Sequence, residues 1–178
     1  MGRRIALLRG INVGSHNRIA MPELRQHLTE AGYGEVRTYV QSGNVVLASD
    51  LEPDDLERQL ERQISERFGI DVHVIVRTRD ELAEVVDRNP LGEFATNPKR
   101  YQVSFLSRAL DPQQVEELAA TAADAERLVA HGRELYAWHP DGVARSRLWA
   151  KLAGTGLGVK ATARNWTTVT TLLDMADE

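Results

Sequence analysis

The 178-residue sequence predicts an α+β protein, because short apolar stretches typical of strands alternate with stretches whose apolar residues recur at helical spacing. The first half has the order strand, helix, strand, strand, helix, strand, which is the order of a ferredoxin-like fold with an antiparallel sheet. The second half starts with the same order of elements, although the two halves show no repeat in sequence. We therefore expect two subdomains, residues 1–90 and residues 91–178, with the proline- and glycine-containing residues 91–100 as the link.

In the first half, apolar spacing defines the elements. Strands are expected at residues 5–8, 36–40, 45–48 and 72–76. Residues 5–8 are apolar without a break, which predicts a strand covered on both faces. Ser42-Gly43 is expected to form a two-residue turn between the second and third strands. Each helix has a proline near its start, a glycine at its end and an apolar stripe. The stripes are Met21, Leu24, Leu28 and Ala31 in the first helix, and Leu56, Leu60, Ile64 and Phe68 in the second.

A further helix and a second set of elements follow. Thr78-Arg79-Asp80-Glu81 has the pattern of a capping box, and Asn89-Pro90 is expected to end the helix that it starts. The remaining elements are strands at 101–106, 127–130 and 135–138, with a turn at 132–133, and helices from 111–112, near 145–152 and at about 165–175. The glycine-rich residues 154–161 lack the spacing of a nucleotide-binding loop, so they are interpreted as a flexible connection.

Composition excludes several functional classes. The chain has no cysteine, which rules out disulfides, thiol catalysis and zinc–thiolate sites. The five histidines lack the spacing of metal ligands and no serine lies in a nucleophile elbow, so no metal, cofactor or catalytic residue is assigned. A net charge of −4, together with first and third strands that contain no aromatic residue, argues against nucleic-acid binding. No apolar stretch suits a membrane span or a signal sequence, which predicts a cytoplasmic protein.

Residues 10–18 form the most unusual stretch of the sequence. Gly10 and Gly14 free the backbone, and Asn12, Asn17 and Arg18 supply polar groups just before a helix begins. This combination suits an anion, because loop amides and the helix dipole both favour negative charge. The alternative is a structured connection whose asparagines bond to nearby backbone, and the loop taken alone favours that alternative.

The turn Gln41-Ser42-Gly43-Asn44 is of interest because of its position. In the predicted topology the first two strands run parallel, so the end of the first strand and this turn share one edge of the sheet. The amides of Gln41 and Asn44 would then face residues 10–18. Simple capping of the hairpin backbone is the alternative, and the turn taken alone favours it.

A third polar stretch, residues 164–168, lies where the last helix is expected to begin. Asn165 suits the N-cap position, and Trp166 suits the core. Arg164 is unexpected at a helix start, because a cation there opposes the helix dipole. This favours a functional or inter-domain role for Arg164.

Several of these stretches together carry a family resemblance. They are residues 6–14, then Asn17, Met21, Leu24, Thr38-Tyr39 and Ser42-Gly43-Asn44, and near the end residues 162–169. They resemble the bacterial family catalogued as domain of unknown function 1697, over nearly the whole chain. The resemblance implies two ferredoxin-like subdomains and supplies no reaction. Ser15 stands where the family usually has a second glycine, which implies a different bend in the loop.

The leading hypothesis from the sequence is a binding module for a small anionic metabolite, such as a nucleotide or a carboxylate. The candidate ligand-binding residues are Arg9, Asn12, Asn17, Ser42 and Asn44, with Arg164 contributing from the other half. The alternative is a structural or protein-interaction protein whose polar motifs join loops and subdomains. Nucleic-acid binding ranks third. The sequence does not distinguish a binder from an enzyme acting on the same ligand, and it does not set the oligomeric state.

Overall fold

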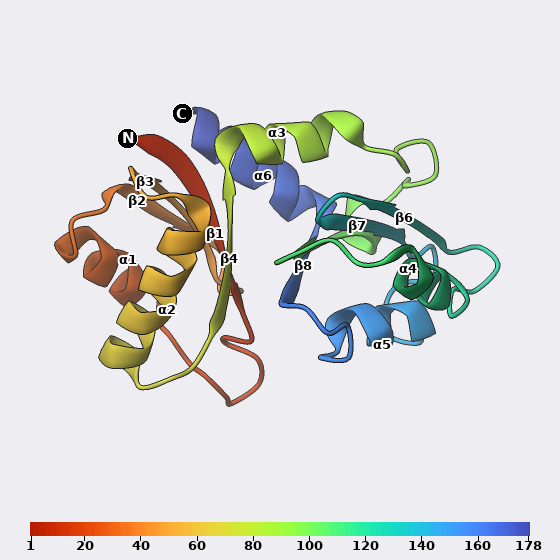
Figure 1. Ribbon diagram of the computed structural model, residues 1–178, viewed down its shortest axis with the longest axis horizontal. Helices are drawn as coiled ribbons and strands as arrows, with labels where there is room; N and C mark the ends of the chain where they lie inside the picture. The colour runs from red at the N-terminus through yellow and green to blue at the C-terminus, as the bar shows by residue number, and fades with distance from the viewer. The chain divides into compact units, whose positions relative to one another are not determined.

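The computed structural model describes residues 1–178, and the chain divides into two compact units. The first unit contains residues 1–83 and 171–178, and the second contains residues 84–170 (Figure 1). Two helices, α3 (Arg79–Arg88) and α6 (Trp166–Asp177), each begin in one unit and end in the other. The division expected from sequence, after residue 90, assigns all of α6 to the second half. The contacts assign the last residues of α6 to the first unit.

The first unit is a ferredoxin-like α+β fold. Its antiparallel sheet has the strand order β2-β3-β1-β4, and helices α1 and α2 cover one face (Figure 1). Its elements are β1 (Gly2–Arg9), α1 (Met21–Glu30), β2 (Gly34–Tyr39), β3 (Asn44–Ser49), α2 (Pro53–Phe68) and β4 (His73–Thr78). The order of strands and helices predicted from the sequence is therefore confirmed.

The predicted apolar stripes of α1 and α2 form the core of this unit. Leu24, Leu56, Leu60 and Ile64 are each no more than 1% exposed. Gly69 ends α2 in the left-handed backbone conformation, with φ of 69°, where its N–H donates to the Ser65 carbonyl. The spacing of apolar residues thus predicts correctly which helix faces are buried.

Strand β1 is buried on both faces, as its unbroken apolar run predicts. Ala6 and Leu8 face the cluster under α1 and α2, and Ile5 and Leu7 on the opposite face are no more than 1% exposed. Arg37 shares a row across the sheet with Ile5, through Val46. It donates hydrogen bonds to the carbonyl of Met175 in the last turn of α6 and to the carboxylate of Glu178, the residue that follows the helix.

The second unit is also ferredoxin-like. Its antiparallel sheet has the order β6-β7-β5-β8, and the residues that α4 and α5 bury pack on one face. Its elements are the short 3₁₀ helix η1 (Pro98–Arg100), β5 (Tyr101–Leu106), α4 (Pro112–Ala119), β6 (Arg127–His131), β7 (Glu134–Trp138), α5 (Arg147–Ala153) and β8 (Ala161–Asn165). Two ferredoxin-like subdomains with antiparallel sheets, as expected, make up the chain.

Strand β8 was not predicted. Residues 161–165 are Ala-Thr-Ala-Arg-Asn, which contain no large apolar side chain and therefore show no alternation. In the structure they pair with β5, with Ala163 opposite Ser104 and Arg164 opposite Val103. Tertiary pairing, not local pattern, makes this segment a strand.

The two predicted hairpin turns have different outcomes. Tyr39 pairs with Asn44, so four residues rather than two connect β2 and β3. His131 pairs with Glu134, which leaves the two-residue turn that was predicted. In the first hairpin the side chain of Asn44 bonds to the Tyr39 carbonyl across the longer turn.

The end of α3 and the residue that follows it are fixed to the second sheet by two tyrosines. The Tyr136 hydroxyl donates to the Val85 carbonyl at 2.9 Å, and the Tyr101 hydroxyl donates to Asn89 at 3.0 Å. Burial raises the pKa of Tyr101 to about 12. Trp166 stacks on Tyr101 with 4.8 Å between ring centroids and is partly buried. No helix in the chain combines the length and the apolar character needed to cross a bilayer.

Candidate functional site

The loop after β1 and the turn between β2 and β3 meet at one edge of the first sheet. Leu7 pairs with Asn44 in the register of β1 and β3, which brings both loops to this edge. The Asn12 side-chain amide joins them, because its Nδ2 donates to the Gln41 carbonyl at 2.7 Å. The same Nδ2 donates to the Ile19 carbonyl, and Oδ1 accepts from the Ile19 N–H. The predicted proximity of the loop and the turn is therefore present.

The other predicted amides also contact backbone. Asn17 Nδ2 donates to the Gly10 carbonyl at 3.1 Å. Asn44 is fully buried, and its Nδ2 donates to the Tyr39 carbonyl and to Ser42 Oγ, both at 3.0 Å. These contacts tie each loop to itself and to its neighbour. They are the contacts that the structural interpretation predicts, and the ligand-binding role of these residues stays a prediction.

Gly43 packs directly on β1. Its carbonyl accepts from the Leu8 N–H at 2.8 Å. Its φ is 93°, and a Cβ at this position would lie 2.8 Å from the Leu8 Cβ. Because both the backbone angle and the close approach exclude a side chain, residue 43 must be glycine for the turn to close on β1.

The two predicted arginines belong to different units. Arg9 is half-buried at the end of β1, opposite His73 of β4, so the structure brings it to the edge that carries Asn12 and Asn44. Arg164 lies in β8 of the second unit, not at the first turn of α6 as the sequence suggests. Asn165 is the N-cap, since its Oδ1 accepts from the Thr168 N–H at 2.9 Å. Because Arg164 lies in a strand, the argument that a cation at a helix start opposes the helix dipole does not apply to it.

Arg164 is a buried cation. Its side chain donates to Thr162 Oγ1 at 2.6 Å and to the Ala163 carbonyl at 2.9 Å, and the residue is 7% exposed. Burial lowers the pKa of its guanidinium to about 10, which leaves it charged at neutral pH. Contacts to oxygen acceptors on its own strand offset part of the cost of burying that charge.

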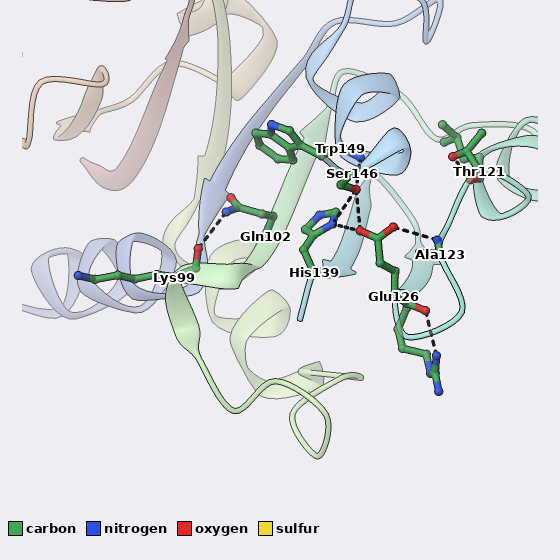
Figure 2. A network of polar contacts seen from close by, with 10 residues as sticks. Lys99, Gln102, Thr121, Ala123, Glu126, His139, Ser146 and Trp149 are labelled. Carbon is green, nitrogen blue, oxygen red and sulfur yellow. Dashed lines mark hydrogen bonds and ion pairs between the residues drawn. The ribbon is translucent and has the colours of Figure 1, made fainter. Parts of the chain in front are cut away.

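A buried polar network in the second unit escaped the sequence analysis (Figure 2). Glu126 lies just before β6, His139 follows β7, and Ser146 caps α5 by accepting from the Trp149 N–H. Glu126 Oε2 lies 2.5 Å from His139 Nδ1 and accepts from Ser146 Oγ at 2.6 Å. Its other oxygen, Oε1, accepts from the Ala123 N–H at 3.0 Å. Both carboxylate oxygens are thus engaged.

Electrostatics favours an ionised Glu126. Burial raises the pKa of this carboxyl, but hydrogen bonds from Ser146, from the Ala123 backbone and from His139 outweigh burial, and the net effect lowers the pKa. An ionised Glu126 makes His139 Nδ1 a donor. His139 is fully buried, and its Nε2 has no hydrogen-bond partner.

The network does not have the geometry of a serine nucleophile. In such a triad the serine bonds to one imidazole nitrogen and the carboxylate to the other. Here Ser146 and Glu126 both approach Nδ1 of His139, and the Ser146 hydroxyl donates to the carboxylate. The arrangement therefore fixes the start of α5 to the start of β6 and does not activate Ser146.

Two adjoining hollows lie beside this network. One, of about 520 Å³, is lined by Ala123, Glu126, Asp141, Gly142, Ala144, Arg145 and Ser146. The other, of about 410 Å³, shares Ala123, Glu126 and Arg145 and adds Arg147 among its lining residues. Arg145 and Arg147 are exposed, and no hydrogen bond or ion pair engages either guanidinium.

Comparison with known proteins places the chain in a family. Residues 1–136 match the family described as "Protein of unknown function (DUF1697)". The chain belongs to this family. The DUF1697 match covers the first unit up to residue 83 and, in the second unit, the chain from β5 into the first three residues of β7. The family resemblance seen in the sequence motifs is therefore confirmed, and the motif at residues 162–169 lies outside the matched range.

A solved structure is similar over nearly the whole DUF1697 chain. It is the conserved bacterial protein SP0830 from Streptococcus pneumoniae, with a TM-score of 0.78 and 24% sequence identity over 98% of each chain. At this identity the similarity establishes the shared fold. The comparison with curated proteins found no match.

Proposed function

We propose that this DUF1697 protein is a binding module for a small anionic metabolite, and that the anion binds in the second unit between Arg145 and Arg147. The observation that carries the proposal is the pair of exposed, unengaged guanidinium groups on the walls of adjoining hollows. A guanidinium is a planar fork of N–H donors that matches the oxygens of a carboxylate or phosphate. Hollows of 410 and 520 Å³ are in the range that holds a small ligand.

The acidic group beside the two arginines is itself engaged in hydrogen bonds. Glu126 also lines both hollows, and an uncompensated carboxylate there would repel an anion. Both of its oxygens accept hydrogen bonds, one of them from Ser146 and from His139 Nδ1. The oxygens of Glu126 are therefore turned into the network, and the other acidic side chain, Asp141, lines only the larger hollow.

Titration calorimetry with citrate, inorganic phosphate and adenosine monophosphate tests the proposal. We expect at least one of these anions to bind, and the double variant Arg145→Ala/Arg147→Ala to bind it at least about tenfold more weakly, as expected for the loss of charge-assisted hydrogen bonds. Lys99→Ala is the matched control, because Lys99 is an exposed cation of the same unit outside both hollows. Equal affinity of the double variant and the native protein, or no binding of any of the three anions, would refute the proposal.

The patch predicted from the sequence is the rival location for the same function. Arg9→Ala in the same titrations decides between the two locations. If Arg9→Ala loses affinity and Arg145→Ala/Arg147→Ala does not, the anion site lies at the edge of the first sheet.

A second candidate function is that of a structural or protein-interaction protein. It is favoured by the amides of Asn12, Asn17 and Asn44, which bond to backbone and hold two loops together. Val13 and Val40, on these two loops, are exposed apolar side chains, at 65% and 51%.

A further inference from the structure

We infer that the second unit holds another binding site, for a zwitterionic compound with an apolar body, such as an apolar amino acid or a dipeptide. The site is a cavity of about 480 Å³ between α4 and α5. Its lining residues are Leu110, Gln114, Glu117, Leu118, Thr121, Ala150, Lys151, Gly154, Gly156 and Leu157. None of them lines the hollows of Arg145 and Arg147 except Thr121, so this site is independent of the proposed anion site.

The apolar part of the lining is a fixed part of the protein core. Leu118 and Leu157 are 6% and 7% exposed and belong to the apolar cluster of the second unit, against which Leu110 packs. Because these side chains are held by the core, the apolar wall exists before a ligand arrives. A ligand with an aliphatic or aromatic body would bury its apolar surface there at little cost in ordering the protein.

Two opposite charges line the same cavity without neutralising each other. Glu117 comes from α4 and Lys151 from α5, and both are exposed. Glu117 accepts only a long contact of 3.4 Å from Gln113, and no acidic group pairs with the Lys151 ammonium. A ligand ammonium near Glu117 and a ligand carboxylate near Lys151 would each gain a charge-assisted hydrogen bond. A purely anionic ligand would meet the unpaired carboxylate of Glu117, which disfavours it.

The glycine-rich wall of the cavity is held in place by side chains of the second unit, and Arg108 donates to the Gly158 carbonyl at 3.3 Å. Gln114 Oε1 accepts from the Asp111 N–H at 3.0 Å, and Gln114 Nε2 donates to the Leu157 carbonyl at 3.3 Å. Residues 154–158 are therefore tied to the start of α4. The segment that the sequence suggests is a flexible connection forms one wall of a cavity.

Titration calorimetry of the full chain with L-leucine and with the dipeptide L-leucyl-L-leucine tests this inference. We expect at least one to bind, and its N-acetylated and C-amidated analogues, which each lack one charge, to bind at least about tenfold more weakly. No binding of either compound at millimolar concentration, or equal binding of the capped analogues, would overturn the inference.

Charge reversal identifies the residues. Glu117→Lys and Lys151→Glu should each weaken binding at least about tenfold, and the double variant should restore it to within a few-fold, since a zwitterion can reverse its orientation. Glu116→Lys is the matched control, because this substitution makes the same charge change on α4 at a residue that does not line the cavity. Arg145→Ala/Arg147→Ala should leave leucine or dipeptide binding unchanged. A double variant that stays as weak as the single variants, or a loss of binding in Glu116→Lys, would contradict the assignment.

Discussion

Asn12 illustrates how the polar motifs act at the scale of single residues. Its backbone φ is 55°, a left-handed conformation that asparagine tolerates better than most residues. Its side chain makes three hydrogen bonds to backbone groups of Ile19 and Gln41. The backbone angle and the contacts of Asn12 both favour asparagine at this position. Its presence in the family motif can therefore be explained by structure, without a ligand.

We predict that Asn12→Ala lowers the free energy of unfolding by about 1–3 kcal/mol, through lost hydrogen bonds and left-handed strain. Urea denaturation measures the change. Gln41→Ala is the control, because Gln41 contributes its carbonyl and not its side chain to this contact. A loss of less than about 0.5 kcal/mol in Asn12→Ala would show that the tie is not structural.

Glu126 gives the protein a pH-dependent stability. Its pKa is lowered in the folded state, so its ionised form stabilises the fold above its ordinary value of 4.5, and this stabilisation is lost as the pH falls through the lowered pKa. We expect the urea midpoint of the native protein to fall steeply with acid below about pH 4.5, and that of Glu126→Gln to fall less steeply. Parallel curves for the two proteins would mean that Glu126 is not linked to folding.

Helix α2 shows the same logic at the scale of an element. Its buried stripe contains Leu56, Leu60 and Ile64, and the reciprocal bonds between Thr78 and Glu81 cap α3 in the way that their spacing predicts. Strand β8, in contrast, has no stripe or alternation of its own. Elements with a strong local pattern appear where the sequence predicts them, and elements that depend on a partner strand do not.

We predict that Leu60→Ala lowers the free energy of unfolding by about 2–5 kcal/mol, because it leaves a cavity in the core of the first unit. Leu60 is 1% exposed. Glu66→Ala, at an exposed position of the same helix, should change stability by no more than about 0.5 kcal/mol. Chemical denaturation of both variants checks the prediction, which a similar loss in both would contradict.

At the scale of the whole molecule, the first unit is completed by the far end of the chain. Residues 171–178 belong to it, and within them Leu172 and Ala176 are 1% and 5% exposed. Arg79 pairs with Asp177 at 2.6 Å, which lowers the pKa of that carboxyl. The first unit therefore includes a segment from the end of the chain, although each unit has its own sheet.

We predict that shortening the chain to residues 1–170 destabilises the first unit by at least about 2 kcal/mol, because the apolar surface that Leu172 covers is then exposed to water. Hydrogen exchange of the backbone amides of β1 to β4, compared between the shortened and the full chain, measures the effect. Leu172→Ala in the full chain should reproduce most of it, within about 2–5 kcal/mol. Unchanged protection of the first sheet in the shortened chain would show that the first unit folds from residues 1–83 alone.

The candidate sites show where sequence reasoning ends. The meeting of the loop and the turn at Asn12 and Gln41 follows from topology, which a strand order read from the sequence can supply. The network of Glu126, His139 and Ser146 joins residues 13 and 20 positions apart. Helical and strand periodicity do not relate residues this far apart, so no local sequence pattern predicts their contact.

The sequence by itself determined the order of elements in the first unit and the buried faces of α1 and α2, because these depend on the spacing of apolar residues and on capping groups a few positions apart. It also determined the family, through short motifs of neighbouring residues. Tertiary structure alone decided that residues 161–165 form a strand, that residues 154–158 wall a cavity, and that the last turns of α6 complete the first unit. The physical reason is range. Spacing and capping act within a few residues, whereas pairing, burial and the engagement of polar groups depend on segments that only the folded chain brings together.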